Sequence, residues 1–167
     1  FSNEALPSAT AEQKVVRYEW MNAIKAKPRP GLAYKYFEPS GKVNMAAIET
    51  GTPVKSGVVN QISISEKNRP DKFAFVFEGY VRIDKDGLYH FFTASDDGSK
   101  LFIDGREIVD NDGDHGTVEK SGKAFLRKGY HALRVTYFDS GGGNGLKVSM
   151  QQEGGKKVEL PGTMLFH

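Results

Sequence analysis

From Gly31 to the carboxyl end, apolar and polar residues alternate with a period of two, which is typical of β-strands. Clusters of Gly, Asp, Asn or Pro interrupt the alternation and divide it into short runs. The pattern predicts nine strands, at residues 32–38, 58–65, 72–84, 87–95, 100–105, 107–110, 124–126, 130–139 and 146–150.

The strand from Phe73 to Asp84 is expected to lie in the interior of a sheet. The phenylalanines at positions 73, 75 and 77 share one face, and Ala74 and Val76 begin the other, so both faces start apolar. The turn sequences at 85–87, 96–98 and 104–105 each end in Asp-Gly, which is typical of hairpin turns and therefore of antiparallel pairing. Strands this frequent, without helices between them, favour a β-sandwich or an open barrel. We predict an all-β fold, an antiparallel β-sandwich, closed by an edge strand and tail at 156–167.

One helical pattern precedes this module. Residues 9–26 carry a loose apolar stripe that includes Tyr18, Met21 and Ile24, so a short N-terminal helix is expected there. The prolines and the glycine at positions 28, 30 and 31 cannot continue it. The predicted organisation is a helix and Pro-rich linker at residues 1–30, followed by a β-sandwich module at residues 31–167.

Composition narrows the class of partner. The 167 residues hold 23 Lys plus Arg against 21 Asp plus Glu, and this net charge of +2 gives no electrostatic reason to expect nucleic acid as a partner. No run approaches the eighteen apolar residues that membrane insertion would need, and the first residues lack the pattern of a signal peptide. With no cysteine, the chain has no disulfide, no thiolate metal site and no cysteine nucleophile.

Two segments could carry binding chemistry. Asp96 and Asp97 are adjacent at a strand end, where two carboxylates repel unless they are solvated, protonated or bridged by a cation. A hard cation such as Ca²⁺ collects six to eight oxygens, commonly from carboxylates and backbone carbonyls. The sequence YFDSGGGNGL could supply a second loop, because Asp139 ends a strand and the glycines after it allow carbonyls to turn toward a metal. The alternatives are a solvated acidic turn and a bare hairpin loop.

Other motifs lack the features that their chemistry requires. The glycine loop leads into a strand, whereas phosphate loops lead into a helix. The acidic residues 110, 112 and 114 match the first, third and fifth ligand positions of an EF-hand calcium loop. However, His115 stands where the loop needs Gly, and Ser121 stands where it needs Glu. The four histidines lack metal-ligand spacing, and no nucleophile motif or defined acid/base pair is present, so the sequence does not support an enzyme.

Residues 31–167 resemble the protective-antigen fourteen-kilodalton domain family. The stretches that carry this resemblance are FVFEGYVRIDKDGLYHFFTASDDGSKLFIDGREIVDNDGDHG and LRKGYHALRVTYFDSGGGNGLKVSM. The family consists of β-sandwich modules in bacterial glycoside hydrolases, fungal adhesins and toxins, and this sequence is most similar to modules of secreted bacterial glycan-degrading enzymes. The resemblance implies an extracellular, periplasmic or cell-surface location.

The resemblance also implies a ligand set. In the adhesin branch, two successive aspartates joined by a cis peptide hold a Ca²⁺ ion that takes hydroxyls of a terminal sugar, and a second loop adds a side chain and carbonyls. The implied metal ligands are Asp96, Asp97, Asp139, Gly141 and Gly143, and the implied sugar-binding residues are Asp96, Asp97 and Asn144. Here Asp139 stands where that branch has Asn, which keeps an oxygen ligand and adds negative charge.

The sequence leaves two functional hypotheses. The first is a non-catalytic carbohydrate-binding module that captures a terminal sugar of a glycan through Ca²⁺ and is linked to a catalytic domain. The second is a structural accessory module that packs against a catalytic domain without binding sugar. An independent enzyme ranks last because no catalytic constellation supports it.

Overall fold

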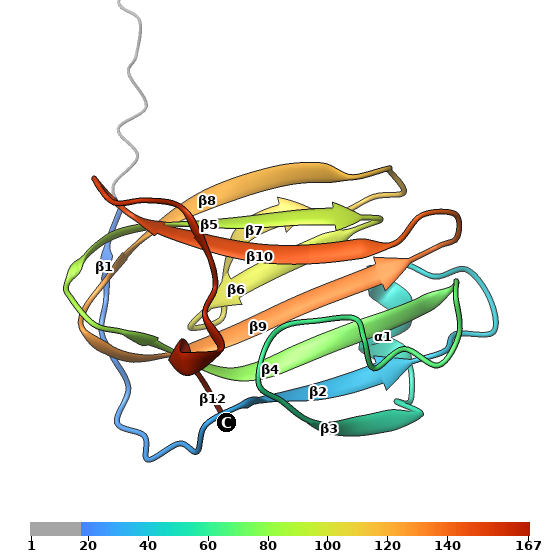
Figure 1. The fold of residues 1–167 in the computed structure, drawn as a ribbon, viewed down its shortest axis with the longest axis horizontal. Coiled ribbons are helices and arrows are strands. Elements are labelled where there is room, and N and C mark those ends of the chain that lie inside the picture. The colour runs from blue at the N-terminus through green and yellow to red at the C-terminus, as the bar shows by residue number, and fades with distance from the viewer. Residues whose placement is uncertain (1–17) are drawn as a thin grey trace, which may run out of the picture.

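The structure, a computed structural model, describes residues 18–167 as two packed β-sheets (Figure 1). The first sheet has the order β1-β8-β5-β10-β11, and the second has the order β3-β2-β4-β9-β6-β7, with β12 added beside β4. The strands of the first sheet are β1 (Trp20–Met21), β5 (Gly87–Asp96), β8 (Val118–Leu126), β10 (Gly145–Gln152) and β11 (Val158–Glu159). Those of the second are β2 (Leu32–Phe37), β3 (Lys55–Val59), β4 (Phe73–Ile83), β6 (Ser99–Ile103), β7 (Arg106–Asn111), β9 (Gly129–Asp139) and β12 (Leu165–Phe166).

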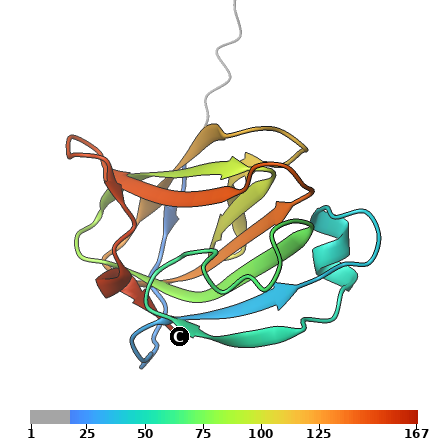
Figure 2. The same ribbon diagram turned by 45° about the vertical axis from the view of Figure 1, so that its right-hand side comes forward.

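The predicted all-β sandwich is confirmed. The strand pairs are antiparallel except β1 with β8, and β4 lies between β2 and β9, so the expected interior position of this strand is correct. The two sheets enclose one apolar core, visible as two layers in Figure 2. The aromatic residues on the inward face of β4, Phe73, Phe75 and Phe77, are fully buried there.

The glycine in the middle of β8 allows two strands to approach closely. A Cβ built on Gly122 would lie 1.7 Å from the backbone oxygen of Ile108 on β7. Strand β8 belongs to the first sheet and β7 to the edge of the second. Only a residue without a side chain therefore fits where these two sheets meet.

The structure corrects the predicted N-terminal helix over its described part. Residues 18–26 are not helical: β1 pairs with β8, and Ile24 forms an isolated bridge to Tyr130. Residues 9–17 lie outside the described residues. Edge pairing and the burial of Met21 outweigh a weak apolar stripe, because helix propensity is small beside tertiary contacts.

A single turn of α-helix lies elsewhere, at α1 (Met45–Thr50). The side chain of Asn44 caps it by accepting a hydrogen bond from the Ala47 backbone N–H at 2.9 Å. Ile48 packs in a second, smaller apolar cluster with Phe37 and Phe138 on the outer face of the second sheet. A 3₁₀ turn, η1 (Gly162–Met164), precedes β12. No helix in residues 18–167 is long and apolar enough to cross a membrane.

Two predicted strands have different bounds. The strand expected at 58–65 is observed at Lys55–Val59, and the one expected at 124–126 extends back to Val118. In both cases the pairing partner sets the limits of the strand: β2 pairs with residues 55–59, and β5 pairs with the whole of β8.

Candidate functional site

The ends of four strands meet at one end of the sandwich, at the right in Figure 1. Strand β5 ends at Asp96, β6 begins three residues later, β9 ends at Asp139 and β10 begins at Gly145. Asp96 is the register partner of Gly145, and Asp139 is that of Phe73 at the start of β4. The fold therefore brings together the two loops that the sequence singled out. We call this place the strand-end site: Asp96, Asp97, Asp139 and the loop 140–144.

The acidic pair of this site joins β5 to β6. The peptide bond between Asp96 and Asp97 is cis, as the family resemblance implies. Asp96 is half-buried, whereas Asp97 is only 5% exposed.

The carboxylate of Asp97 is held by two other loops. Its Oδ1 accepts a hydrogen bond from the His115 backbone N–H at 2.9 Å. Its Oδ2 accepts one from the Ser140 N–H at 2.8 Å and one from the Ser140 hydroxyl at 2.9 Å. Three donors keep this buried charge solvated by the protein and fix the carboxylate against the glycine loop.

Asp96 is fixed through its backbone. The hydroxyl of Tyr137, buried on β9, donates to the Asp96 carbonyl oxygen at 2.6 Å and accepts from the Gly145 N–H at 3.2 Å. Burial raises the pKa of the Tyr137 hydroxyl, so it stays a proton donor. One inward-facing tyrosine thus ties β5, β9 and β10 together beneath the site.

The glycine loop lies against the acidic pair. Gly141 and Gly142 have φ angles of 129° and 96°, which residues with a side chain rarely adopt. A Cβ built on Gly143 would lie 2.9 Å from Oδ2 of Asp96. The backbone therefore approaches the carboxylate as closely as it does because position 143 has no side chain.

Asp139 carries the unsatisfied group of the site. Its side chain is 0% exposed, and Oδ2 accepts a hydrogen bond from the Lys72 N–H at 2.8 Å. Its Oδ1 is buried without a hydrogen-bond partner. Burial raises the pKa of this carboxyl, and the charges of Asp71, Asp97 and Asp96 raise it further. A buried carboxylate with a free oxygen favours any cation placed beside it.

Asn144 is engaged by a neighbouring loop. Its Oδ1 accepts a hydrogen bond from Lys67 Nζ at 2.6 Å, and its Nδ2 donates to the Pro70 carbonyl at 2.9 Å. These bonds join the loop between β3 and β4 to the glycine loop. The predicted role of Asn144 in sugar binding stays a prediction.

The chemistry of these donors fits a hard cation such as Ca²⁺. The loops offer carboxylate and carbonyl oxygens, and the buried Oδ1 of Asp139 lacks a partner. Within residues 18–167, no group of three or more His, Cys, Asp or Glu side chains is placed to hold a metal ion. The carboxylates alone therefore do not complete a coordination shell, and a cation here would also need the loop carbonyls and further oxygens.

Sequence reasoning missed four groups that support the site: Ser140, the hydroxyl of Tyr137, the backbone N–H of His115 and the backbone N–H of Lys72. Ser140 directly follows Asp139 in the motif, so its position in the chain was a usable signal. The two backbone donors lie 18 and 67 residues from the carboxylates that they bind, so no local sequence pattern predicts these contacts.

The other polar motifs have structural partners. Of the acidic residues 110, 112 and 114, Asp110 lies on β7 and pairs with Lys100 at 3.3 Å. The other two lie in the loop 112–117 between β7 and β8, which we call the acidic loop. The buried imidazole of His131 lies between Asp104 Oδ2 at 2.7 Å from Nδ1 and the Arg127 carbonyl at 2.8 Å from Nε2. Both neighbours are acceptors, so both ring nitrogens donate only when the imidazole is protonated.

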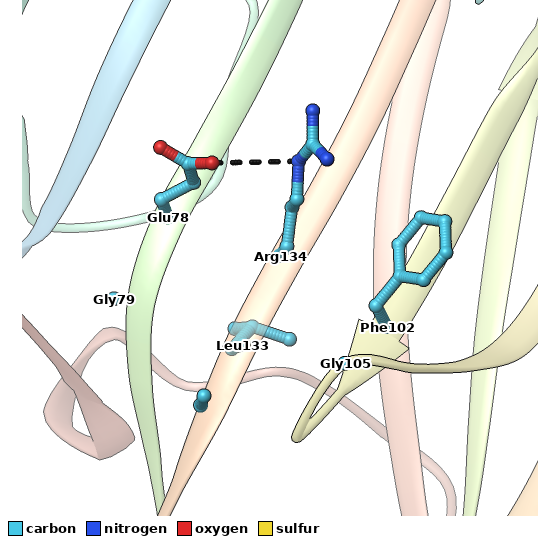
Figure 3. A pocket seen from close by; sticks show the side chains of 7 residues that line it. Glu78, Gly79, Phe102, Gly105, Leu133 and Arg134 are labelled. Atoms are coloured by element: carbon cyan, nitrogen blue, oxygen red, sulfur yellow. Dashed lines mark ion pairs between the residues drawn. The ribbon is translucent and has the colours of Figure 1, made fainter.

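A cavity of about 370 Å³ opens elsewhere, on the outer face of the second sheet (Figure 3). Glu78 of β4 and Arg134 of β9 form an ion pair of 3.4 Å at its border, and Phe102 of β6 lies on the other side. Glu78 and Arg134 lie in the middle of their strands, whereas the acidic site lies at strand ends. The cavity has no titratable cluster beyond this ion pair among its lining residues, so we do not assign the site to it.

The model of one protein family, the PA14 domain, matches residues 28–163. No curated protein matches the chain in a comparison of sequences.

Several solved structures share the fold. A PA14 sugar-binding domain from an RTX adhesin superposes with a TM-score of 0.71 at 18% identity, covering 83% of this chain and 99% of that one. The A domain of epithelial adhesin 9 from Candida glabrata, in complex with Galβ1-3GlcNAc, gives 0.66 at 12% identity, covering 86% and 94%. A β-glucosidase from Kluyveromyces marxianus, in complex with glucose, gives 0.56 at 20% identity, covering 73% of this chain and 15% of the enzyme. The chain spans about half the length of two anti-sigma factor domain-containing proteins that it also matches, 47% and 50%.

Proposed function

Because this chain belongs to the PA14 domain family, we propose that it is a non-catalytic carbohydrate-binding module that takes a terminal sugar at the strand-end site with the help of Ca²⁺. The observation that carries the proposal is the buried carboxylate of Asp139, which has an unpartnered oxygen beside the acidic pair. Two structural neighbours, a sugar-binding domain and an adhesin domain in complex with a disaccharide, support the choice of ligand class.

The residues have separate roles in this proposal. Asp96, Asp97 and Asp139 supply carboxylate oxygens, and Gly141 and Gly143 supply backbone carbonyls. A Ca²⁺ ion held by these oxygens would supply positive charge and open coordination positions for hydroxyl oxygens of a sugar. The hydrogen bonds from Ser140 and His115 keep the Asp97 carboxylate in place before any ligand arrives, so little side-chain entropy is lost on binding.

The comparisons also support a proposal for the kind of protein to which this module is attached. The match to part of a β-glucosidase supports a module attached to a glycan-degrading enzyme. Membership of the PA14 domain family supports a location outside the cell, in the periplasm or at the cell surface. One small site binds a sugar weakly, but a linked catalytic domain is then held near its glycan at high effective concentration.

A second candidate function is a structural module that packs on a catalytic domain without binding sugar. Exposed aromatic side chains favour it: Tyr18 is 50% exposed, and Trp20 is 42% exposed and lies against Phe125 with ring centroids 5.1 Å apart. Aromatic side chains gathered on a surface are typical of protein interfaces.

Calorimetric titration with CaCl₂ and then a glycan array, run with calcium and with EDTA, separate the two candidates. The first candidate requires calcium binding and calcium-dependent retention of at least one glycan. Glycan retention in Asp112→Ala should equal the wild type, because Asp112 lies on the acidic loop and its carboxylate bonds only to that loop. A chain that binds neither calcium nor any glycan would refute the first candidate and favour the structural one.

A further inference from the structure

The loop between β3 and β4 borders the strand-end site and carries three basic residues, Lys67, Arg69 and Lys72. We call it the basic loop, residues 60–72. Three contacts attach it to the site: the Lys72 N–H donates to Asp139, Lys67 Nζ donates to Asn144, and the Asn144 amide donates to the Pro70 carbonyl. Because Asn144 follows the loop glycine that touches Asp96, these contacts place the basic loop beside the acidic pair.

The three basic side chains have no carboxylate partner within residues 18–167. Lys67 contacts a neutral amide oxygen, and Arg69 donates to the carbonyl oxygens of Pro39 and Lys72. By contrast, Lys55, at the start of β3, is paired with Glu66 at 2.8 Å. Within residues 18–167, Lys67, Arg69 and Lys72 therefore form no ion pair, although Glu66 and Asp71 of the same loop carry the opposite charge.

Lys67 is the best placed of the three. It is half-buried, its Nζ lies 2.6 Å from Asn144 Oδ1, and the same atom lies 5.4 Å from the centre of the Phe73 ring. An ammonium group has three donors, and one hydrogen bond to Asn144 leaves two for a ligand. The contact with Asn144 restrains a side chain that would otherwise be mobile, so less entropy is lost when it binds an anion.

The charge balance of the site depends on the basic loop. Asp139 shares this end of the sandwich with three other carboxylates, those of Asp71, Asp96 and Asp97, and in addition to burial their charges raise the pKa of its carboxyl. With one Ca²⁺ bound these four carboxylates retain two negative charges, which would repel an anionic sugar. Lys67 Nζ, which contacts Asn144 next to the loop glycine beside Asp96, places a positive charge near these carboxylates. This charge gives an anionic group a local partner at a site that is built of carboxylates.

We propose that the basic loop makes the strand-end site selective for terminal sugars that carry a carboxylate, the hexuronic acids, with Lys67 Nζ as the partner of that carboxylate. This inference rests on the proposed sugar-binding function and names the class of sugar. In a hexuronic acid, the ring hydroxyls remain available to a cation while the carboxylate extends from the ring, so one ligand can use both the acidic pair and the basic loop.

The test compares sugars that differ only in the carboxylate. Galacturonic acid against galactose, and glucuronic acid against glucose, are titrated by calorimetry with the same calcium concentration in cell and syringe. The wild type should bind the acid of at least one pair about fivefold more tightly, which is the upper range for a partly exposed ion pair. The preference should shrink as NaCl is raised, because salt screens exposed charges.

Variants identify the residue responsible. Lys67→Gln should lose the preference, measured as the ratio of the affinities for the acid and the neutral sugar, and Lys67→Arg should keep it. Lys156→Gln is the matched control, because Lys156 is exposed in the turn after β10, whereas the site adjoins the beginning of that strand. The melting temperature of each variant shows that its fold is intact.

The failures can be told apart. Tighter or equal binding of the neutral sugar in both pairs overturns this inference and leaves the sugar-binding proposal standing. A preference that survives in a folded Lys67→Gln overturns the role of Lys67. No binding of any sugar or glycan overturns the proposed function and this inference with it.

Discussion

Replacing Asp139 by Asn should stabilise the calcium-free protein, although Asp139 is a fully buried residue of the candidate site. The carboxylate accepts one hydrogen bond from Lys72, and its other oxygen has no partner. Asn keeps an oxygen for the Lys72 N–H and removes the charge. The substitution therefore eliminates a buried, partly unsatisfied anion at almost constant volume.

The size of the effect follows from two opposing contributions. Either side chain leaves one buried polar atom without a partner, at a cost of about 1–3 kcal/mol that is larger for a charged group than for a neutral amide, whereas a hydrogen bond to a charged acceptor is worth about 1 kcal/mol more than one to a neutral acceptor. The net gain is about 1 kcal/mol in the free energy of unfolding, which corresponds to a rise of about 2–4 °C in Tm for a chain of this length.

The pH dependence has a definite sign. The folded pKa of Asp139 is raised above 3.8, so the unfolded chain releases this proton first, and ionisation costs stability as pH rises from the unfolded pKa to the folded one. The advantage of Asp139→Asn should therefore be small below the unfolded pKa and should reach its full size above the folded pKa. In saturating calcium the advantage should shrink, because a bound cation compensates the charge that only the wild type carries.

Urea and thermal unfolding in EDTA and in CaCl₂, from about pH 3 to pH 7, measure the stability gain of Asp139→Asn, its dependence on pH and its dependence on calcium. Asp114→Asn is the control, because Asp114 is exposed on the acidic loop and should leave stability unchanged. The reasoning fails if Asp139→Asn is less stable than the wild type in EDTA at neutral pH, since the carboxylate would then be well satisfied in the folded state.

Three further predictions test the site and the fold. Asp97→Ala should weaken calcium affinity in calorimetry much more than Asp112→Ala, because the first removes a proposed ligand and the second an exposed acid; equal losses would place the ion on the acidic loop. Gly122→Ala should lower the free energy of unfolding by about 1–3 kcal/mol, because its Cβ would collide with a backbone oxygen. Gly116→Ala is the control and should change stability far less, because the space around Gly116 is open. Similar urea midpoints for the two variants would contradict the close approach of the two sheets. Burial lowers the pKa of His131, but hydrogen bonds to a carboxylate and a carbonyl outweigh burial and leave the pKa above 6.5. The protonated imidazole should therefore stabilise the fold fully below pH 6.5, and this contribution should be lost as pH rises through the folded pKa. The stability difference between wild type and His131→Gln should therefore narrow as pH rises to about 9, and a difference that stays constant in urea unfolding would mean that the imidazole does not titrate there.

The sequence by itself determined the class of fold and the position of the acidic pair. Alternation with period two fixes which residues of a strand share a face, and it does so from local spacing alone, so the interior position of β4 could be predicted. Turns rich in Asp and Gly likewise predict antiparallel hairpins, because the conformation of such a turn depends only on its own few residues. The acidic pair and the glycine loop could be singled out because each is a local motif, and the family resemblance assigned them to one site.

Only the tertiary structure decided which groups meet. Whether residues 18–26 form a helix depended on a free edge at β8, which pairs with Trp20 and Met21 and buries the latter. The donors that hold Asp97 come from residues 18 and 43 positions away, and the basic loop reaches the site through contacts across 67 to 77 positions. Local spacing specifies the face on which a side chain lies, but the hydrogen-bond partners of a buried charge depend on which strand ends become neighbours, and the packing of the two sheets decides that.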